Sequence, residues 1–85
     1  QNLTLDLAEE NNKQSIITLT NQGTSSIEDF KVQIFPPEVG SVPQIKSDFK
    51  EDLNLSYDNE TNSYYISINK LTPKTSRKII ISFGS

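Results

Sequence analysis

The side chains that could perform chemistry in this chain are carboxylates, hydroxyls and three tyrosines. Among its 85 residues there is no histidine and no cysteine. The commonest general base, the thiol nucleophile and most transition-metal ligand sets are therefore missing. No serine lies in a Gly-x-Ser-x-Gly elbow, and the glycines, Gly23, Gly40 and Gly84, form no phosphate-binding loop. We expect no enzymatic activity and no cofactor.

Acidic residues gather in short clusters, and one cluster has the composition of a calcium loop. The clusters are Glu9-Glu10, Glu28-Asp29, Asp48 with Glu51-Asp52, and Asp58 with Glu60. Residues 58–62, Asp-Asn-Glu-Thr-Asn, offer the oxygen ligands that Ca²⁺ takes. They lack the spaced Asp-x-Asp-x-Asp-Gly frame, and a hairpin tip needs the same residue types. We interpret this segment as a turn and assign no metal site.

The three tyrosines could form an aromatic platform for a sugar ring or a protein. Tyr57 and Tyr64 share the parity of the apolar residues in their strands, which favours a place in the core. Tyr65 has the opposite parity, and we expect it to share an outer face with Ile80. Tyr65 is therefore the tyrosine that we expect a partner to contact.

The distribution of charge argues against two classes of partner. Eight basic and eleven acidic residues give a net charge of −3, and the two signs are interspersed. The sequence has no basic patch that could bind along a phosphate backbone, and no Lys/Arg run flanks an amphipathic segment. No apolar run approaches the roughly 20 residues that span a bilayer. We expect neither a nucleic-acid partner nor direct membrane insertion.

Alternating apolar residues predict an all-β fold. The clearest pair of strands lies within 16–35, where Ile17 and Leu19 share one face and Val32 and Ile34 share another. The predicted strands are 2–7, 15–20, 30–35, 53–57, 64–68 and 77–83, with a short edge strand at 44–47. Six to seven short strands at this spacing predict one antiparallel β-sandwich over residues 1–85.

Parity within each strand also predicts the core, and composition predicts the connections. Residues 8–14 and 71–76 are expected to be loops. Asn21 and Gly23 are expected to serve the turn after the second strand, because both residue types tolerate positive φ. The residues predicted to line a shared core are Leu5, Leu19, Val32, Ile34, Ile66, Ile68, Ile79 and Ile81.

Two short motifs resemble landmarks of prokaryotic immunoglobulin-like modules. In the first, an apolar strand ends in Asn21-Gln22-Gly23 and a second apolar strand follows at 30–34, a pattern shared with CARDB-type and related repeats of cell-surface proteins. The second, residues 71–76, is similar to their Leu-x-Pro-Gly-x-Ser turn, with Lys74 at the glycine position. The resemblance implies a spacer, adhesive unit or substrate-orienting appendage, and it transfers no functional residue. A shorter similarity to adaptor-appendage sandwiches implies a peptide-binding face.

The irregular segment 36–52 is where we expect a partner to bind, either there or along the adjacent sheet edge. It interrupts the strand pattern, and long irregular connections in a sandwich are usually binding loops or spacers. The alternative is that its apolar residues cap one open end of the core. The residues expected to contact a partner are Val39, Val42, Ile45, Phe49 and Tyr65.

These observations favour a non-catalytic spacer or adhesive module of a microbial cell-surface or secreted protein. The alternative is a carbohydrate- or peptide-binding module appended to an extracellular enzyme or adaptor. The expected partners are a protein or neighbouring domains of the same chain, with a glycan as a further option. The chain begins at Gln1 with no signal-peptide pattern, so we expect a domain of a larger exported protein, located outside the cell or in its envelope.

Overall fold

The computed structural model of the chain describes residues 2–11, 13–47 and 53–84, and their regular structure is entirely β. The strands are β1 (Leu3–Asn11), β2 (Gln14–Asn21), β3 (Ile27–Ile34), β4 (Pro43–Ser47), β5 (Leu53–Asp58), β6 (Ser63–Leu71) and β7 (Thr75–Phe83). The described residues contain no helix long and apolar enough to cross a membrane. The predicted immunoglobulin-like antiparallel β-sandwich is confirmed with seven strands, and the short edge strand is β4.

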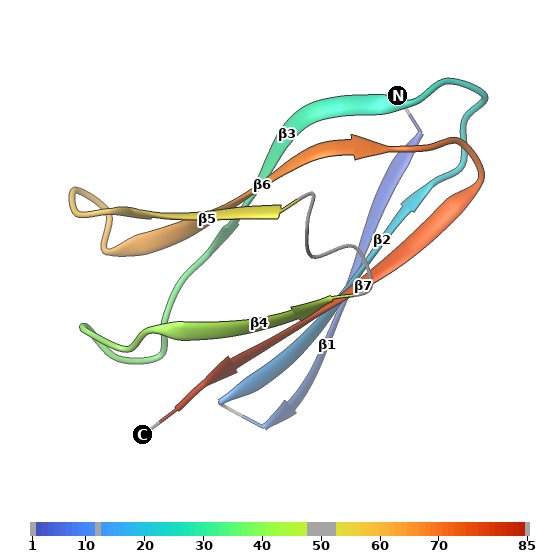
Figure 1. Cartoon of the computed structure of the whole chain (residues 1–85). Helices are drawn as coiled ribbons and strands as arrows, with labels where there is room; N and C mark the ends of the chain where they lie inside the picture. The colour runs from blue at the N-terminus through green and yellow to red at the C-terminus, as the bar shows by residue number, and fades with distance from the viewer. Residues whose placement is uncertain (1, 12, 48–52, 85) are drawn as a thin grey trace.

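The strands form two antiparallel sheets that face each other (Figure 1). One sheet has the order β1-β2-β7-β4 and the other the order β3-β6-β5. In a constant-type immunoglobulin domain the fifth strand lies beside the second, and the seventh joins the other sheet. Here β7 lies beside β2, and β5 pairs with β6 in a hairpin. The sandwich architecture is therefore immunoglobulin-like, while the fifth and seventh strands have exchanged places.

The core lies between the sheets and consists mainly of aliphatic residues from β2, β3, β6 and β7. Its buried members are Ile17, Leu19, Val32, Ile66, Ile68, Leu71, Ile79, Ile81 and Phe83. Six of the eight predicted core residues are among them, and Ile34 packs against them while partly exposed. The strand parities were therefore assigned correctly for the central strands.

The predictions for Leu5 and Leu71 were wrong, one as a core residue and the other as a loop residue. Leu5 has the inward parity, opposite Leu19 of β2, yet 49% of its surface is exposed. It lies on the edge strand β1, beyond the cover of the facing three-stranded sheet. Leu71, predicted to lie in a loop, is the fully buried last residue of β6.

The polar segment 8–14 was also predicted wrongly as a loop. β1 continues through Asn11, and Ala8 and Glu9 pair with Ile16 and Ser15 of β2. A register shift follows Glu9 before the hairpin closes. Backbone hydrogen bonds can extend an antiparallel ladder through residues that have no apolar alternation, so the side-chain pattern ended before the strand did.

Asn21 holds the two sheets together at one end of the sandwich. Its buried side-chain amide donates to the carbonyl oxygens of Leu71 (3.0 Å) and Ser25 (2.8 Å). Its side-chain oxygen accepts a hydrogen bond from the Gly23 amide at 2.9 Å. One side chain thus satisfies three backbone groups from β6 and the β2–β3 connection, so Asn21 serves the turn through these hydrogen bonds and not through the expected positive φ.

The two motifs that carry the family resemblance meet at this same end. Besides the contact from Asn21, the Lys74 ammonium donates to the Gln22 carbonyl oxygen at 2.8 Å. The hydroxyls of Thr20 and Ser76 share a hydrogen bond of 2.8 Å. Lys74 also has a φ of 57°, the left-handed conformation that glycine adopts most easily. The turn therefore keeps a glycine-like backbone geometry although the residue is lysine.

The reason predicted for Gly23 was wrong. Of the glycines, Gly40 has a φ in the left-handed region, whereas Gly23 and Asn21 do not. A Cβ atom at Gly23 would lie 2.9 Å from the Asn2 side-chain nitrogen and 3.3 Å from the Asn21 side-chain oxygen. Space next to Asn2 and Asn21, rather than backbone conformation, explains a glycine at this position.

Candidate binding clefts

The sandwich is open along both sides, and a cleft lies on each. The edge strands β4 and β5 flank one side, and β1 and β3 flank the other. Each cleft runs between the edge strands of two different sheets, where no further strand of the described chain covers the inward-facing side chains. These clefts are the candidate sites for a partner.

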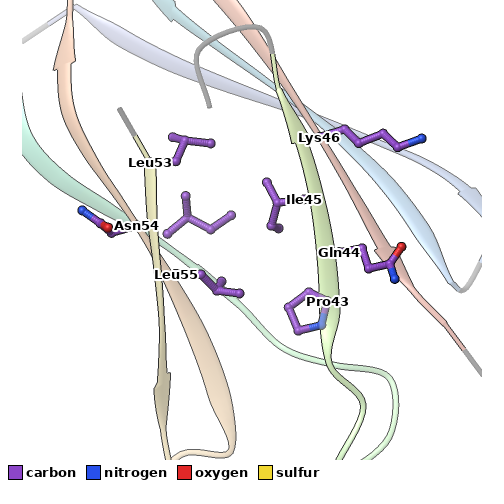
Figure 2. A pocket seen from close by; sticks show the side chains of 8 residues that line it. Pro43, Gln44, Ile45, Lys46, Leu53, Asn54 and Leu55 are labelled. Carbon is purple, nitrogen blue, oxygen red and sulfur yellow. The ribbon is translucent and has the colours of Figure 1, made fainter. Parts of the chain in front are cut away.

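The cleft between β4 and β5 has a volume of about 510 Å³ (Figure 2). Figure 2 shows Pro43 and Ile45 of β4 facing Leu53 and Leu55 of β5 across the cleft, and Ile66 completes its lining. The polar lining residues extend away from this space in the same view: Gln44, Lys46 and Asn54. The interior of the cleft is therefore apolar and has a polar rim.

The cleft between β1 and β3 has a volume of about 350 Å³ and is lined throughout by described residues. Ile17, Ile81 and Phe83 belong to the core. Its rim carries Leu7, which is 59% exposed, and the exposed Phe35 that follows β3. The full lining is Leu5, Leu7, Ser15, Ile17, Val32, Gln33, Ile34, Phe35, Ile81 and Phe83. This lining gives an apolar cleft with one hydroxyl and one amide.

The 58–62 loop has the internal contacts of a hairpin tip. The Asp58 carboxylate accepts a hydrogen bond from the Glu60 amide at 3.0 Å, and the Tyr57 hydroxyl donates to the Asn62 side-chain oxygen at 2.8 Å. Asn62 has a φ of 54°, which suits a turn. Across the described residues, no three His, Cys, Asp or Glu side chains lie close enough to hold a metal ion. These contacts agree with the interpretation as a turn.

The predicted contact residues from the irregular segment do not form one surface. Val39, 82% exposed, and Val42 project into solvent, so neither caps the core. Ile45 packs against the core and also lines the β4/β5 cleft. Phe49 lies outside the described residues. The segment therefore divides into an exposed part and a part of the core, and the contact with a partner stays a prediction.

The expected outer face shared by Tyr65 and Ile80 does not exist. Tyr65 is in β6 and Ile80 is in β7, which belong to different sheets. The outward side of each sheet faces away from the other, so the two residues lie on opposite faces of the sandwich. Tyr65 instead has the Lys31 ammonium 5.6 Å from its ring centre, a cation–π contact.

Sequence reasoning missed the role of the apolar residues at the two edges. Leu7, Leu55 and Tyr57 have inward parity but are exposed. The favoured core position of Tyr57 was therefore wrong, although its ring centre lies 4.9 Å from that of the buried Tyr64, with the two rings tilted by 53°. Parity alone cannot show that a strand lies at an edge, because that depends on strand order.

Comparison of the chain with protein-family models, curated proteins and solved structures finds no match in any of the three.

Proposed function

We propose that this chain is a non-catalytic spacer or adhesive module of a microbial cell-surface or secreted protein, and that it binds protein through its open sides. The observation that carries the proposal is the chemistry of the two clefts. Their interiors are apolar, and the polar groups in their linings are amides, one hydroxyl and one ammonium. Such surfaces bind apolar side chains well and provide no acid–base pair.

The path of the chain supports the spacer role. β1 and β7 both run antiparallel to β2, so they point in the same direction. Leu3 is level with Thr75, and Phe83 lies eight residues further along the sheet. At about 3.3 Å per residue, the described chain enters and leaves at points roughly 26 Å apart along the strands. A module with this path can be placed in line between neighbouring domains.

The two resembling motifs support a location outside the cell or in its envelope. They contact each other through the Asn21 and Lys74 hydrogen bonds, so they form a single structural feature. In the modules that share this pattern, that feature belongs to exported proteins. A carbohydrate- or peptide-binding role remains the alternative proposal, and the same clefts would serve it.

Hydrogen exchange measured by mass spectrometry tests this function. Amide exchange of the domain is compared alone, with a neighbouring domain of the parent protein, with a pool of extended peptides and with an oligosaccharide panel. Protection of the β1 or β5 edge by protein or peptide is the expected result. The matched control is protection of the central strands β2 and β6, which should not change.

Three outcomes oppose the proposal in different ways. Protection confined to the outer faces around Tyr65, with oligosaccharide alone, would replace it with carbohydrate binding. Unchanged exchange at both edges with every partner would remove the claim that the open sides bind. Turnover of any added oligosaccharide or peptide would contradict the non-catalytic assignment.

A further inference from the structure

We infer that the partner of the β1/β3 side is a second copy of this chain, which adds its own β1 to the free edge of β1. The inference rests on the proposed function, because it names the protein that one open side binds. The resulting interface is symmetric: each copy offers the same edge strand and the same uncovered leucines. The two four-stranded sheets would join into one continuous sheet.

The first step is that β1 is the longest of the four edge strands, and its register shift follows Glu9, outside the stretch Leu3–Ala8. Natural edges are guarded by proline, lysine, short length or local irregularity. β4 has five residues, starts at Pro43 and carries Lys46. β3 carries Lys31 and has a positive φ of 55° at Asp29. β1 has nine residues with no proline, lysine or arginine. β5 also lacks these residues but is six residues long.

The second step is that the inward side of β1 already presents an apolar surface. Leu5 and Leu7 point toward the cleft and are 49% and 59% exposed. Phe35 extends that surface from the facing sheet. A strand added beside β1 would place its own inward side chains over the cleft, against all three residues. The second copy thus covers surface from both sheets.

The third step is that one register alone sets the three inward leucines of each copy opposite leucines of the other, and charge agrees with it. An antiparallel pair keeps inward residues opposite inward residues only when the centre of symmetry falls on a residue. Centring on Asp6 would oppose two carboxylates, and centring on Leu7 would set Leu5 opposite Glu9. Centring on Leu5 pairs Leu5 with itself and Leu3 with Leu7.

In that register the polar side of the pair is also complementary. Thr4 of each copy lies opposite Asp6 of the other, where a hydroxyl can donate to a carboxylate. Asp6 is the one charged residue between Leu3 and Ala8. No like charges are therefore opposed along this stretch, and the leucines of both copies gather on the cleft side.

Sedimentation velocity tests the assembly at protein concentrations from about 1 μM to 1 mM, the range of weak association. The expected result is a rise from the mass of one chain to that of two. Leu5→Lys should abolish this rise, because it puts two ammonium groups opposite each other. Leu55→Lys is the matched control, since Leu55 is an inward, 43% exposed leucine on the opposite edge, and it should still dimerise.

Disulfide cross-linking tests the register, and the absence of native cysteine makes each single substitution specific. Mild oxidation of Leu5→Cys should link most of the dimer, whereas Leu55→Cys should remain unlinked. A mixture of Thr4→Cys and Asp6→Cys should cross-link at least several-fold more than either variant alone. Equal cross-linking of all these variants would contradict the register.

The remaining outcomes overturn the inference without removing the proposed function. A single-chain mass throughout the concentration range rules out the symmetric dimer. Dimerisation lost in Leu55→Lys and kept in Leu5→Lys assigns the contact to β5 instead. Either result leaves open-side binding of other proteins to the hydrogen-exchange experiment, in which protection of an edge by a different chain would still support it.

Discussion

The two open sides of the sandwich have similar interiors and different edges. Both clefts expose inward leucines, Leu5 on β1 and Leu55 on β5, to nearly the same extent. On one side the facing strand β4 is short and begins with proline. On the other, β1 is long and contains no proline or lysine. The comparison teaches that inward parity and burial are separate properties, and that edge chemistry decides whether an uncovered side can accept a strand.

The largest effect on stability is expected at Asn21, whose side chain holds the two sheets together. Asn21→Asp replaces two amide donors with carboxylate oxygens facing the carbonyls of Leu71 and Ser25. An uncompensated buried charge should lower the free energy of unfolding by about 3–5 kcal/mol. Urea denaturation measures it, with the exposed neighbour Gln22→Glu as control at under about 0.5 kcal/mol. Equal losses in both variants would show that Asn21 does not join the sheets.

The next largest effect on stability is expected for the buried isoleucines that line the bottom of each cleft. Ile66→Ala beneath the β4/β5 side and Ile81→Ala beneath the β1/β3 side should each cost about 2–5 kcal/mol. Both residues are 1% exposed, so the two losses should agree closely. Denaturant midpoints of the two variants provide the measurement. A loss below about 1 kcal/mol in one variant alone would mean that the core beneath that cleft is loosely packed. The two sides would then differ in their core packing rather than in their edge strands.

These expectations separate what sequence could predict from what it could not. Alternation placed Leu19, Ile66 and Ile79 in the core, because the central strands β2, β6 and β7 are covered whichever neighbours they have. The same alternation failed for Leu5, whose burial depends on strand order. Strand order is set by contacts between distant segments, and no local pattern encodes it.

The candidate clefts could likewise be predicted only in part from local sequence patterns. Within the predicted irregular segment 36–52, residues 36–42 are irregular and β4 follows at Pro43–Ser47, so Val39 and Ile45 lie in different environments. The apolar rim at Leu7 follows from the place of β1 at the edge of its sheet. The turn role of Asn21 could be predicted because Asn and Gly close together are a local turn signal. Its hydrogen bond to the Leu71 carbonyl, 50 residues away, could not be predicted from a local pattern.

Substitution of the exposed leucines at the cleft rims should change stability less, and the change should depend on protein concentration. Leu55→Ala should lower stability by about 1 kcal/mol, since roughly half of that side chain is already in water. Leu5→Ala should match it in dilute protein and exceed it when concentrated, because association stabilises the folded state. Thermal unfolding at two protein concentrations measures this difference. Concentration-independent values for both leucines would mean that the two edges behave alike.

The smallest effect is expected at Lys74, which touches neither cleft and therefore serves as a reference for both sides. Its left-handed backbone costs a non-glycine residue about 1 kcal/mol, so Lys74→Gly should relieve strain. The substitution also removes the exposed hydrogen bond to the Gln22 carbonyl and increases the entropy of the unfolded chain. These terms oppose each other, and Lys74→Gly should change stability by less than about 1 kcal/mol.

Lys74→Ala separates the opposing terms, because it removes the same hydrogen bond and keeps the strained backbone. It should therefore be less stable than Lys74→Gly by about 1 kcal/mol in chemical denaturation. Neither substitution should alter the concentration dependence of unfolding that is expected for the β1 edge. Alanine as stable as glycine would show that the turn relaxes out of the left-handed region. A changed concentration dependence would link this end of the sandwich to the open sides.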